Sequence, residues 1–312
     1  MPPTTTMFRC RLVGLPYCFA LIALGALLAG CDARPQPTPI ERQQPIEQLA
    51  LSVALSGADV PAAGLLGDRL DGSVDRSALR AVLAALAVPD VRFEVLDDAR
   101  APLLLARAAV TQWEPELLTP ERIAGNGQSV SGADVLAAGT PRVVLGSPFV
   151  ARYSPLKPLG LLQVDGLIRS PLQTFGYTRI LGVQGPTLGV VSRSAFDPGL
   201  FSDAVQLGPG IIESGALAIS EREVRLPAYF RTFAVICEEE AVLGLSLVPT
   251  HLRHVGERLL DWSSSTGVSC AEAVNFSGDR EALFIVVGAA GSLVIGRPQL
   301  PKTALLALGP RP

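Results

Sequence analysis

Arg231 is the residue whose type and position point most directly to ligand binding. It stands at the start of an apolar, β-branched run, Phe230 to Ile236, which predicts a buried strand. A planar guanidinium at the start of a strand suits bidentate recognition of a phosphate or a carboxylate. A structural ion pair is the other interpretation of the same residue, and the sequence leaves both open.

Three carboxylates beside the predicted strands are candidates for acid–base chemistry. Asp165 precedes Gly166, Glu213 follows an Ile-Ile pair, and Asp279 follows Gly278. Cleavage of a glycosidic bond generally requires two suitably spaced carboxyl groups, so Asp165 and Asp279 are the catalytic candidates. An Asp-Gly pair is also typical of a turn, which gives Asp165 a structural interpretation as well.

Asn275 and the two histidines have weaker signals. Asn275 either contacts a ligand or orders a loop through side-chain hydrogen bonds to the backbone. His251 and His254 lie one helical turn apart without an obvious third metal ligand, so we expect packing residues and no metal site. We expect no cofactor, because neither a Walker loop nor a dinucleotide fingerprint occurs in a convincing context.

The N-terminus has the pattern of a secreted lipoprotein. Arg9 and Arg11 precede an uncharged stretch that ends in Leu-Ala-Gly-Cys at Cys31. This ending matches the bacterial lipobox, which predicts a signal peptide over residues 1–30 and lipidation at Cys31. A plain transmembrane anchor is the alternative. The prediction is a lipid-anchored protein that faces the periplasm of the bacterial cell envelope. Asp32 after the cysteine is associated with inner-membrane retention in enteric bacteria, but the sequence leaves the choice of inner or outer membrane open.

Composition restricts the class of partner and the redox setting. The formal net charge of the 312-residue chain is -3, and removing the signal, with its two arginines and no acids, makes it -5. A phosphate-backbone binder needs a basic surface, so nucleic acid is excluded as a partner. In an oxidising periplasm Cys237 and Cys270 either form a disulfide or remain buried thiols.

The chain after the signal divides into three parts. A Pro/Gln-rich stretch over residues 31–47 predicts a tether, residues 48–90 a helical and extended region packed on the main domain, and residues 91–312 that domain. A helix is predicted over residues 78–86 with Asp75 near its start, and another over 251–262. Strands are predicted at 91–96, 102–110, 143–145, 160–164, 180–183, 189–191, 230–236 and 283–287. The fold class is α+β, with mixed, mostly antiparallel sheets and a few helices.

Five short segments follow one another in a characteristic order. They are 137–149 (AAGTPRVVLGSPF), 158–166 (PLGLLQVDG), 204–215 (AVQLGPGIIESG), 230–236 (FRTFAVI) and 267–279 (GVSCAEAVNFSGD). This succession resembles the phosphodiester glycosidase family. That family has an Asn-Gly-Gly-Phe-Phe-like strand end, a Gly-Leu-x-x-x-Asp-Gly segment, a Gln-x-Gly-Pro segment, an Arg-Thr strand and an Ala-x-Asn-Leu-Asp-Gly-Gly element. The resemblance covers residues 90–310 and implies the fold of that family and a site containing Asp165, Gly208, Arg231 and Asn275.

The departures from the family pattern fall among the polar residues. Leu145 stands where the family has asparagine, Pro148 replaces an aromatic residue, and Ser277 stands where the family has aspartate. Leucine makes no side-chain hydrogen bond and serine is no carboxylate. Asp279 is displaced by two positions from the lost acid, so it substitutes only if the loop is rearranged.

Three functions are compatible with these observations. The first is a degenerate module that binds an envelope glycan, a phosphate-bearing ligand or an envelope protein. The second is an active glycosidase that cleaves a sugar-phosphodiester or exopolysaccharide linkage, and the third is a structural lipoprotein, since fold does not carry function with it. The loss of both the asparagine and the aspartate favours the binding module.

Overall fold

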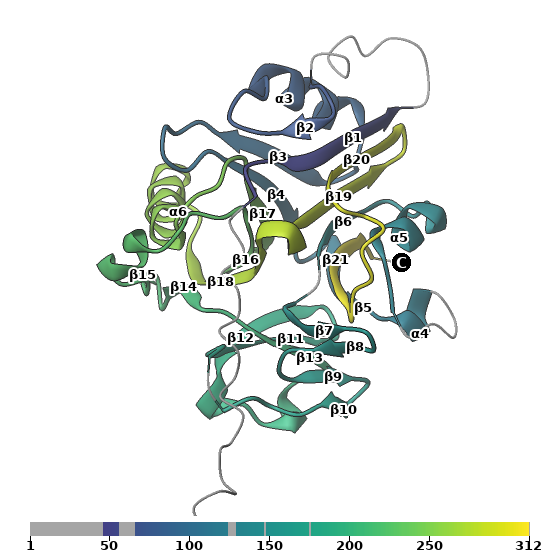
Figure 1. The fold of residues 1–312 in the computed structure, drawn as a ribbon, viewed down its shortest axis with the longest axis vertical. Coiled ribbons are helices and arrows are strands. Elements are labelled where there is room, and N and C mark those ends of the chain that lie inside the picture. The colour runs from purple at the N-terminus through teal and green to yellow at the C-terminus, as the bar shows by residue number, and fades with distance from the viewer. Residues whose placement is uncertain (1–45, 56–65, 124–128, 147, 175, 312) are drawn as a thin grey trace, which may run out of the picture. The chain divides into compact units, whose positions relative to one another are not determined.

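A computed structural model describes residues 46–55, 66–123, 129–146, 148–174 and 176–311 (Figure 1). The predicted signal peptide, Cys31 and the tether up to residue 45 lie outside the described residues. Residues 45–312 form one compact unit. In the part of the chain that the structure describes, no helix is long and apolar enough to cross a membrane.

Two seven-stranded sheets and one five-stranded sheet make up the unit, and all strand pairings are antiparallel. The terminal sheet has the order β2 (Arg69–Leu70), β1 (Leu49–Leu55), β20 (Gly291–Gly296), β19 (Leu283–Gly288), β6 (Arg142–Leu145), β21 (Leu305–Pro310), β5 (Trp113–Leu118). The central sheet has the order β15 (Ala216–Leu217), β14 (Gly210–Glu213), β18 (Cys270–Gly278), β16 (Arg231–Cys237), β17 (Glu240–Ser246), β4 (Leu103–Ala109), β3 (Val91–Leu96).

The remaining elements are shorter. The five-stranded sheet has the order β10 (Leu167–Ser170), β9 (Leu162–Val164), β13 (Asp203–Leu207), β11 (Arg179–Gln184), β12 (Thr187–Ser192), and β7 (Val150–Tyr153) pairs with β8 (Leu156–Pro158). The α-helices are α3 (Arg76–Ala85), α4 (Pro120–Ile123), α5 (Gly132–Ala138) and α6 (Leu252–Thr266). The 3-10 turns are η1 (Arg193–Ala195), η2 (Pro198–Leu200), η3 (Glu221–Arg225) and η4 (Asp279–Glu281). The predicted α+β class with mostly antiparallel sheets is confirmed.

Successive side chains of a strand point to opposite faces of its sheet, so each sheet packs against a different part of the protein on each face. The main core lies between the two seven-stranded sheets, and the five-stranded sheet contributes Leu162, Val205 and Leu207 to it. On β16, Ala234 faces this core, whereas Phe233 and Val235 face the opposite side. Helix α6 covers that opposite side of the central sheet with Leu252, Val255, Leu259 and Trp262 (Figure 1). The strand that carries Arg231 is thus buried on both faces.

Local sequence signals account for several element boundaries. Helix α3 begins where expected, because the Asp75 side chain accepts hydrogen bonds from the backbone N–H groups of Ser77 and Ala78. Helix α6 ends at Gly267, whose φ of 71° is readily adopted only by glycine. Residues 49–55 form a strand of the terminal sheet beside β20.

Candidate functional site

The strand pair β16–β18 brings two of the sequence motifs together. Arg231 at the start of β16 lies opposite Gly278 at the end of β18, and Cys237 lies opposite Cys270 at the other end of the pair. The register shifts near Phe276, so β18 carries a bulge close to Arg231. Bulges bend a strand and re-aim its side chains, and they are frequent beside functional sites. Arg231 and the residues of this bulge therefore define the candidate site.

Arg231 is buried with its hydrogen-bonding capacity unused. Its side chain is only 12% exposed, its Nη2 lies 3.6 Å from Glu223 Oε1, and its guanidinium lies 4.9 Å from the centre of the Tyr229 ring. Among the described residues no acceptor lies within hydrogen-bonding distance of the guanidinium, and Nε is fully buried without a partner. Burial lowers the pKa of Arg231, and the charge of Glu223 offsets this only in part.

Glu223 pairs only loosely with Arg231 because it caps a helix. Its two oxygens accept hydrogen bonds from the backbone N–H groups of Leu252 and Arg253, the first residues of α6, at 3.0 and 3.2 Å. His251 Nδ1 lies 3.9 Å from the same carboxylate. The Glu223 carboxylate thus lies closer to the start of α6 than to Arg231, and it makes no hydrogen bond to the guanidinium.

The two histidines lie at the beginning of α6 and pack against each other. The rings of His251 and His254 meet edge to face, with centroids 5.4 Å apart. Within the described residues no group of three or more His, Cys, Asp or Glu side chains is placed to hold a metal ion.

Asn275 orders the turn at Gly208 from inside the protein. Its Nδ2 donates to the Gly208 carbonyl at 3.1 Å, its backbone N–H donates to the Pro209 carbonyl, and the Gly208 N–H donates back to the Asn275 carbonyl. Gly208 has a φ of 131°, a conformation that glycine alone adopts easily. Asn275 is 1% exposed, and its Oδ1 has no hydrogen-bond partner among the described residues. The structure thus brings together Asn275 and Gly208, which were both predicted to bind ligand, and Asn275 holds the backbone of the turn.

The two positions that depart from the family pattern are both buried. The Ser277 hydroxyl is 2.7 Å from the Thr232 hydroxyl, and both residues are 0% exposed. Leu145 is also fully buried, opposite Phe284 on β19. Neither replacement offers a group to a ligand in this conformation.

Asp165 lies away from the other candidates. Its carboxylate is 69% exposed and pairs with Arg122, which also binds Asp203 at 2.9 Å. The backbone N–H of Asp165 donates to Oδ1 of Asp203, which is the first residue of β13, so Asp165 lies at the beginning of that strand. Gly208 directly follows the last residue of β13 and therefore lies at its other end. Five residues of strand separate these ends by about 16 Å. The structure therefore joins Asn275 with Gly208, and Arg231 with Gly278, but does not bring Asp165 to them.

The loop after β18 contains Asp279 and an acidic residue that the sequence did not single out. Asp279 Oδ1 accepts a hydrogen bond from the backbone of Ile46 at 2.8 Å, and its charge acts on Arg231. Glu281, two residues later, pairs with Lys302 at 2.5 Å and accepts a hydrogen bond from the Tyr153 hydroxyl. The other acidic candidate, Glu213, pairs with Arg179. Lys302 stands out in the sequence only because the chain has just two lysines, and Glu281 has no local sequence signal.

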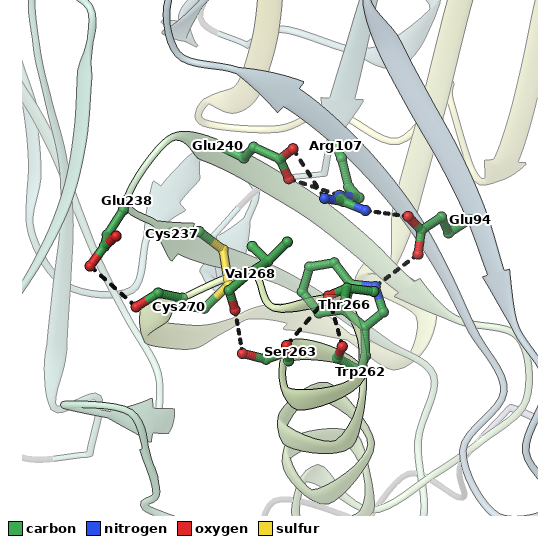
Figure 2. The surroundings of a disulfide bond; sticks show 11 residues. Glu94, Arg107, Cys237, Glu238, Glu240, Trp262, Ser263, Thr266, Val268 and Cys270 are labelled. Carbon is green, nitrogen blue, oxygen red and sulfur yellow. Dashed lines mark hydrogen bonds and ion pairs between the residues drawn. A yellow bond between two sulfur atoms is a disulfide. The ribbon is translucent and has the colours of Figure 1, made fainter.

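Figure 2 shows the other end of the strand pair, where a disulfide joins Cys237 and Cys270. Close to it, Arg107 binds both oxygens of Glu240, at 2.8 and 3.0 Å, and also hydrogen bonds to Glu94. Glu94 in turn accepts a hydrogen bond from Trp262 Nε1 at 2.8 Å. Burial lowers the pKa of Arg107, but hydrogen bonds and charge from the two carboxylates outweigh it and raise the pKa overall.

Comparisons with known proteins support the fold. The structure is similar to the zebrafish N-acetylglucosamine-1-phosphodiester alpha-N-acetylglucosaminidase catalytic domain auto-inhibited by pro-peptide, with a TM-score of 0.50 and 12% sequence identity over 84% of this chain and 89% of that one. A hypothetical protein from Synechocystis matches with a TM-score of 0.46 and 10% identity over 71% of this chain and 61% of that one. No family model matches the chain, and no curated protein matches it either. The resemblance to phosphodiester glycosidases is thus supported as a resemblance of fold.

Proposed function

We propose that this domain binds a phosphate-bearing ligand, such as a sugar phosphate or a phosphodiester-linked envelope glycan, at the Arg231 end of β16–β18. The observation that carries the proposal is the largely buried Arg231 guanidinium, whose side chain is 12% exposed and which has no hydrogen-bond acceptor among the described residues. Burying a charge without hydrogen bonds is costly, so such a group is typically kept for a ligand that supplies them. A phosphate offers oxygens that match the fork of a guanidinium.

The setting we propose follows from the N-terminal sequence. Lipidation at Cys31 would anchor the protein in a bacterial envelope membrane, inner or outer, with the domain facing the periplasm. An envelope glycan or sugar phosphate is then the ligand within reach, and an envelope protein that carries an anionic group is the alternative partner. The predicted absence of nucleic-acid partners and of cofactors stays a prediction.

Hydrolysis of a sugar-phosphodiester linkage is the second candidate function. It is favoured by Asp279 and Glu281, which lie two residues apart on the loop beside Arg231. Against it, Asp279 is engaged by the Ile46 backbone, Glu281 by Lys302, and Ser277 is buried against Thr232. Binding without turnover therefore accounts for more of the geometry.

The test is a titration of the full chain, purified in detergent, with glucose 1-phosphate and with a sugar-1-phosphodiester. Arg231→Met should weaken binding at least tenfold, because hydrogen bonds to a charged group contribute about 1.5–3 kcal/mol each. Arg169→Met, which removes an exposed arginine from β10, is the matched control and should bind like the wild type.

Two outcomes of this titration would count against the proposal. Wild-type protein that binds neither compound rejects it, and so does an Arg231→Met variant with unchanged affinity. Chromatographic detection of released sugar, lost in Arg231→Met, would instead establish the hydrolase.

A further inference from the structure

The 3-10 turn η3, which supplies Glu223 to the Arg231 site, carries apolar side chains on the outside of the protein. Val224 is 38% exposed, and Leu226, the residue that ends the turn, is 59% exposed. Both belong to the small set of large hydrophobic side chains that are exposed in the described part of the chain. A single exposed apolar residue is ordinary, so the residues beside these two decide what the turn can contact.

The same turn carries two arginines without partners. Arg222 and Arg225 are both exposed, and neither has an ion pair or a side-chain hydrogen bond among the described residues. Since side chains three residues apart in a 3-10 helix lie above one another, the two guanidiniums project from the same side. The acids of the turn are matched by other cations, because Glu223 lies 3.6 Å from Arg231 and Glu221 lies 4.0 Å from an arginine of α6. The turn therefore presents unmatched positive charge beside exposed apolar side chains.

The chain enters the described unit beside the same site. Ile46, the first described residue, donates its backbone N–H to Asp279 Oδ1 at 2.8 Å, and the charge of Asp279 acts on Arg231. Ile46 follows the predicted lipidation site Cys31 by 15 residues, which span at most about 50 Å when fully extended. Because η3 and the entry point both border Arg231, the predicted anchor holds η3 within reach of a membrane surface.

We propose that the outer side of η3 docks on an anionic lipid surface, with Val224 and Leu226 in the headgroup layer and Arg222 and Arg225 against lipid phosphates. Apolar side chains flanked by basic residues are typical of proteins that lie on membranes, and each basic residue near an anionic surface contributes about fivefold to the affinity. The net charge of the chain is -3, but at 0.1 M salt repulsion by acids more than about 10 Å away is screened. The contact needs no ligand at Arg231, so it goes beyond the proposed function.

The test places a tryptophan reporter on each of two equally exposed leucines. Leu226→Trp reports on η3, and Leu167→Trp is the matched control, because Leu167 on β10 is also 59% exposed. The full chain is reconstituted through its N-terminal segment into phosphatidylglycerol vesicles that contain brominated phospholipid, which quenches tryptophan fluorescence only at short range. The native Trp113 and Trp262 are buried and common to both variants. Docking predicts quenching of Leu226→Trp but not of Leu167→Trp, and phosphatidylcholine vesicles should largely remove the difference.

Removal of charge separates docking from tethering alone. Arg222→Gln combined with Arg225→Gln, in the Leu226→Trp background, should lower the ratio of docked to undocked protein about 25-fold, so that quenching is lost. Arg169→Gln removes an exposed arginine of β10 that likewise has no partner among the described residues, and it should keep the quenching. Salt at about 1 M, where the Debye length is about 3 Å, should reproduce the loss seen in the double arginine variant.

The inference is overturned if the two reporters are quenched equally or not at all. It is also overturned if Leu167→Trp is quenched more strongly, which would make β10 the side that faces the membrane, or if the double arginine variant keeps full quenching. None of these results involves the affinity of Arg231 for phosphate, which is titrated separately. Failure of the docking surface and failure of the proposed function are therefore distinguishable.

Discussion

At one end of the β16–β18 strand pair, Arg107 lies close to the disulfide and donates hydrogen bonds to Glu94 and Glu240. At the other end, Arg231 has no acceptor within hydrogen-bonding distance of its guanidinium among the described residues. Strand β16 runs seven residues from Arg231 to Cys237, and its six residue-to-residue steps separate these ends by about 20 Å. Both guanidiniums belong to the same sheet and both are largely buried, with 6% and 12% of the side chain exposed. The difference lies in their partners.

The pKa directions express the same contrast. Hydrogen bonds that Arg107 donates to two carboxylates outweigh burial and raise the pKa of Arg107, whereas burial prevails and lowers the pKa of Arg231. A buried cation whose hydrogen bonds are satisfied costs the fold less free energy than a buried cation that lacks them. We therefore call the first the closed end (Cys237, Cys270 and Arg107) and the second the open end (Arg231 and Gly278).

Removal of the disulfide should have the largest effect on stability. Replacing Cys237 and Cys270 together by alanine opens a loop of 33 residues, and the chain-entropy relation then predicts a loss of about 3–4 kcal/mol in the free energy of unfolding. Urea denaturation of the full chain measures it. The affinity for ligand at the open end should change less than twofold. A loss below about 1 kcal/mol in the free energy of unfolding would show that the stability of the closed end does not depend on the disulfide.

The matched pair Arg107→Met and Arg231→Met tests the comparison directly. Arg107→Met leaves Glu94 and Glu240 unpaired, and breaking a buried pair costs about 3–5 kcal/mol. We expect the lower value, about 3 kcal/mol, because the two carboxylates are 22% and 26% exposed. Arg231→Met should change stability by less than about 1 kcal/mol, since it removes a buried charge that makes no hydrogen bond. Equal losses in the two variants by urea denaturation would contradict the distinction between the ends.

The sequence predicts the positions of the strands better than it predicts which side chains the strands place beside one another. The runs at 91–96 and 230–236 were recognisable because apolar and β-branched residues dominate them, and both are strands of the central sheet. Short strands such as β15 and β2 have two residues each and carry no periodic signal. The predicted α+β class followed from the many short apolar runs alone.

The candidate site was predicted in part, for a physical reason. Arg231 has a recognisable position at a strand start, but its lack of hydrogen bonds depends on where Glu223 lies in three dimensions. Glu281 had no local signal, because its partners Tyr153 and Lys302 are 128 and 21 residues away in the sequence. Asp165 was grouped with Arg231 by the order of the motifs, while the length of β13 separates it from Gly208.

The smallest expected effect is a pH dependence of stability that comes from Lys302, whose partner Glu281 lies on the loop that follows the open end. Burial lowers the pKa of Lys302 below 10.5, and Glu281 offsets this only in part. Between the lowered pKa of the folded state and 10.5, the unfolded chain binds a proton that the folded chain has released. Stability should therefore rise with pH in this window, by at most about 1.4 kcal/mol per pH unit.

Urea denaturation at a series of pH values from about 8 to about 10 measures this slope in the window set by the lysine pKa. Above the ordinary tyrosine pKa the raised pKa of the half-buried Tyr177 acts in the opposite direction, which sets the upper limit of the series. Lys302→Met combined with Glu281→Gln, which leaves no unpaired carboxylate, should abolish the rise, and Lys157→Met should retain it. The closed end contributes no such slope, because the pKa of Arg107 is raised and Arg107 stays protonated throughout. A slope that persists in the double variant would mean that Lys302 is not the group responsible.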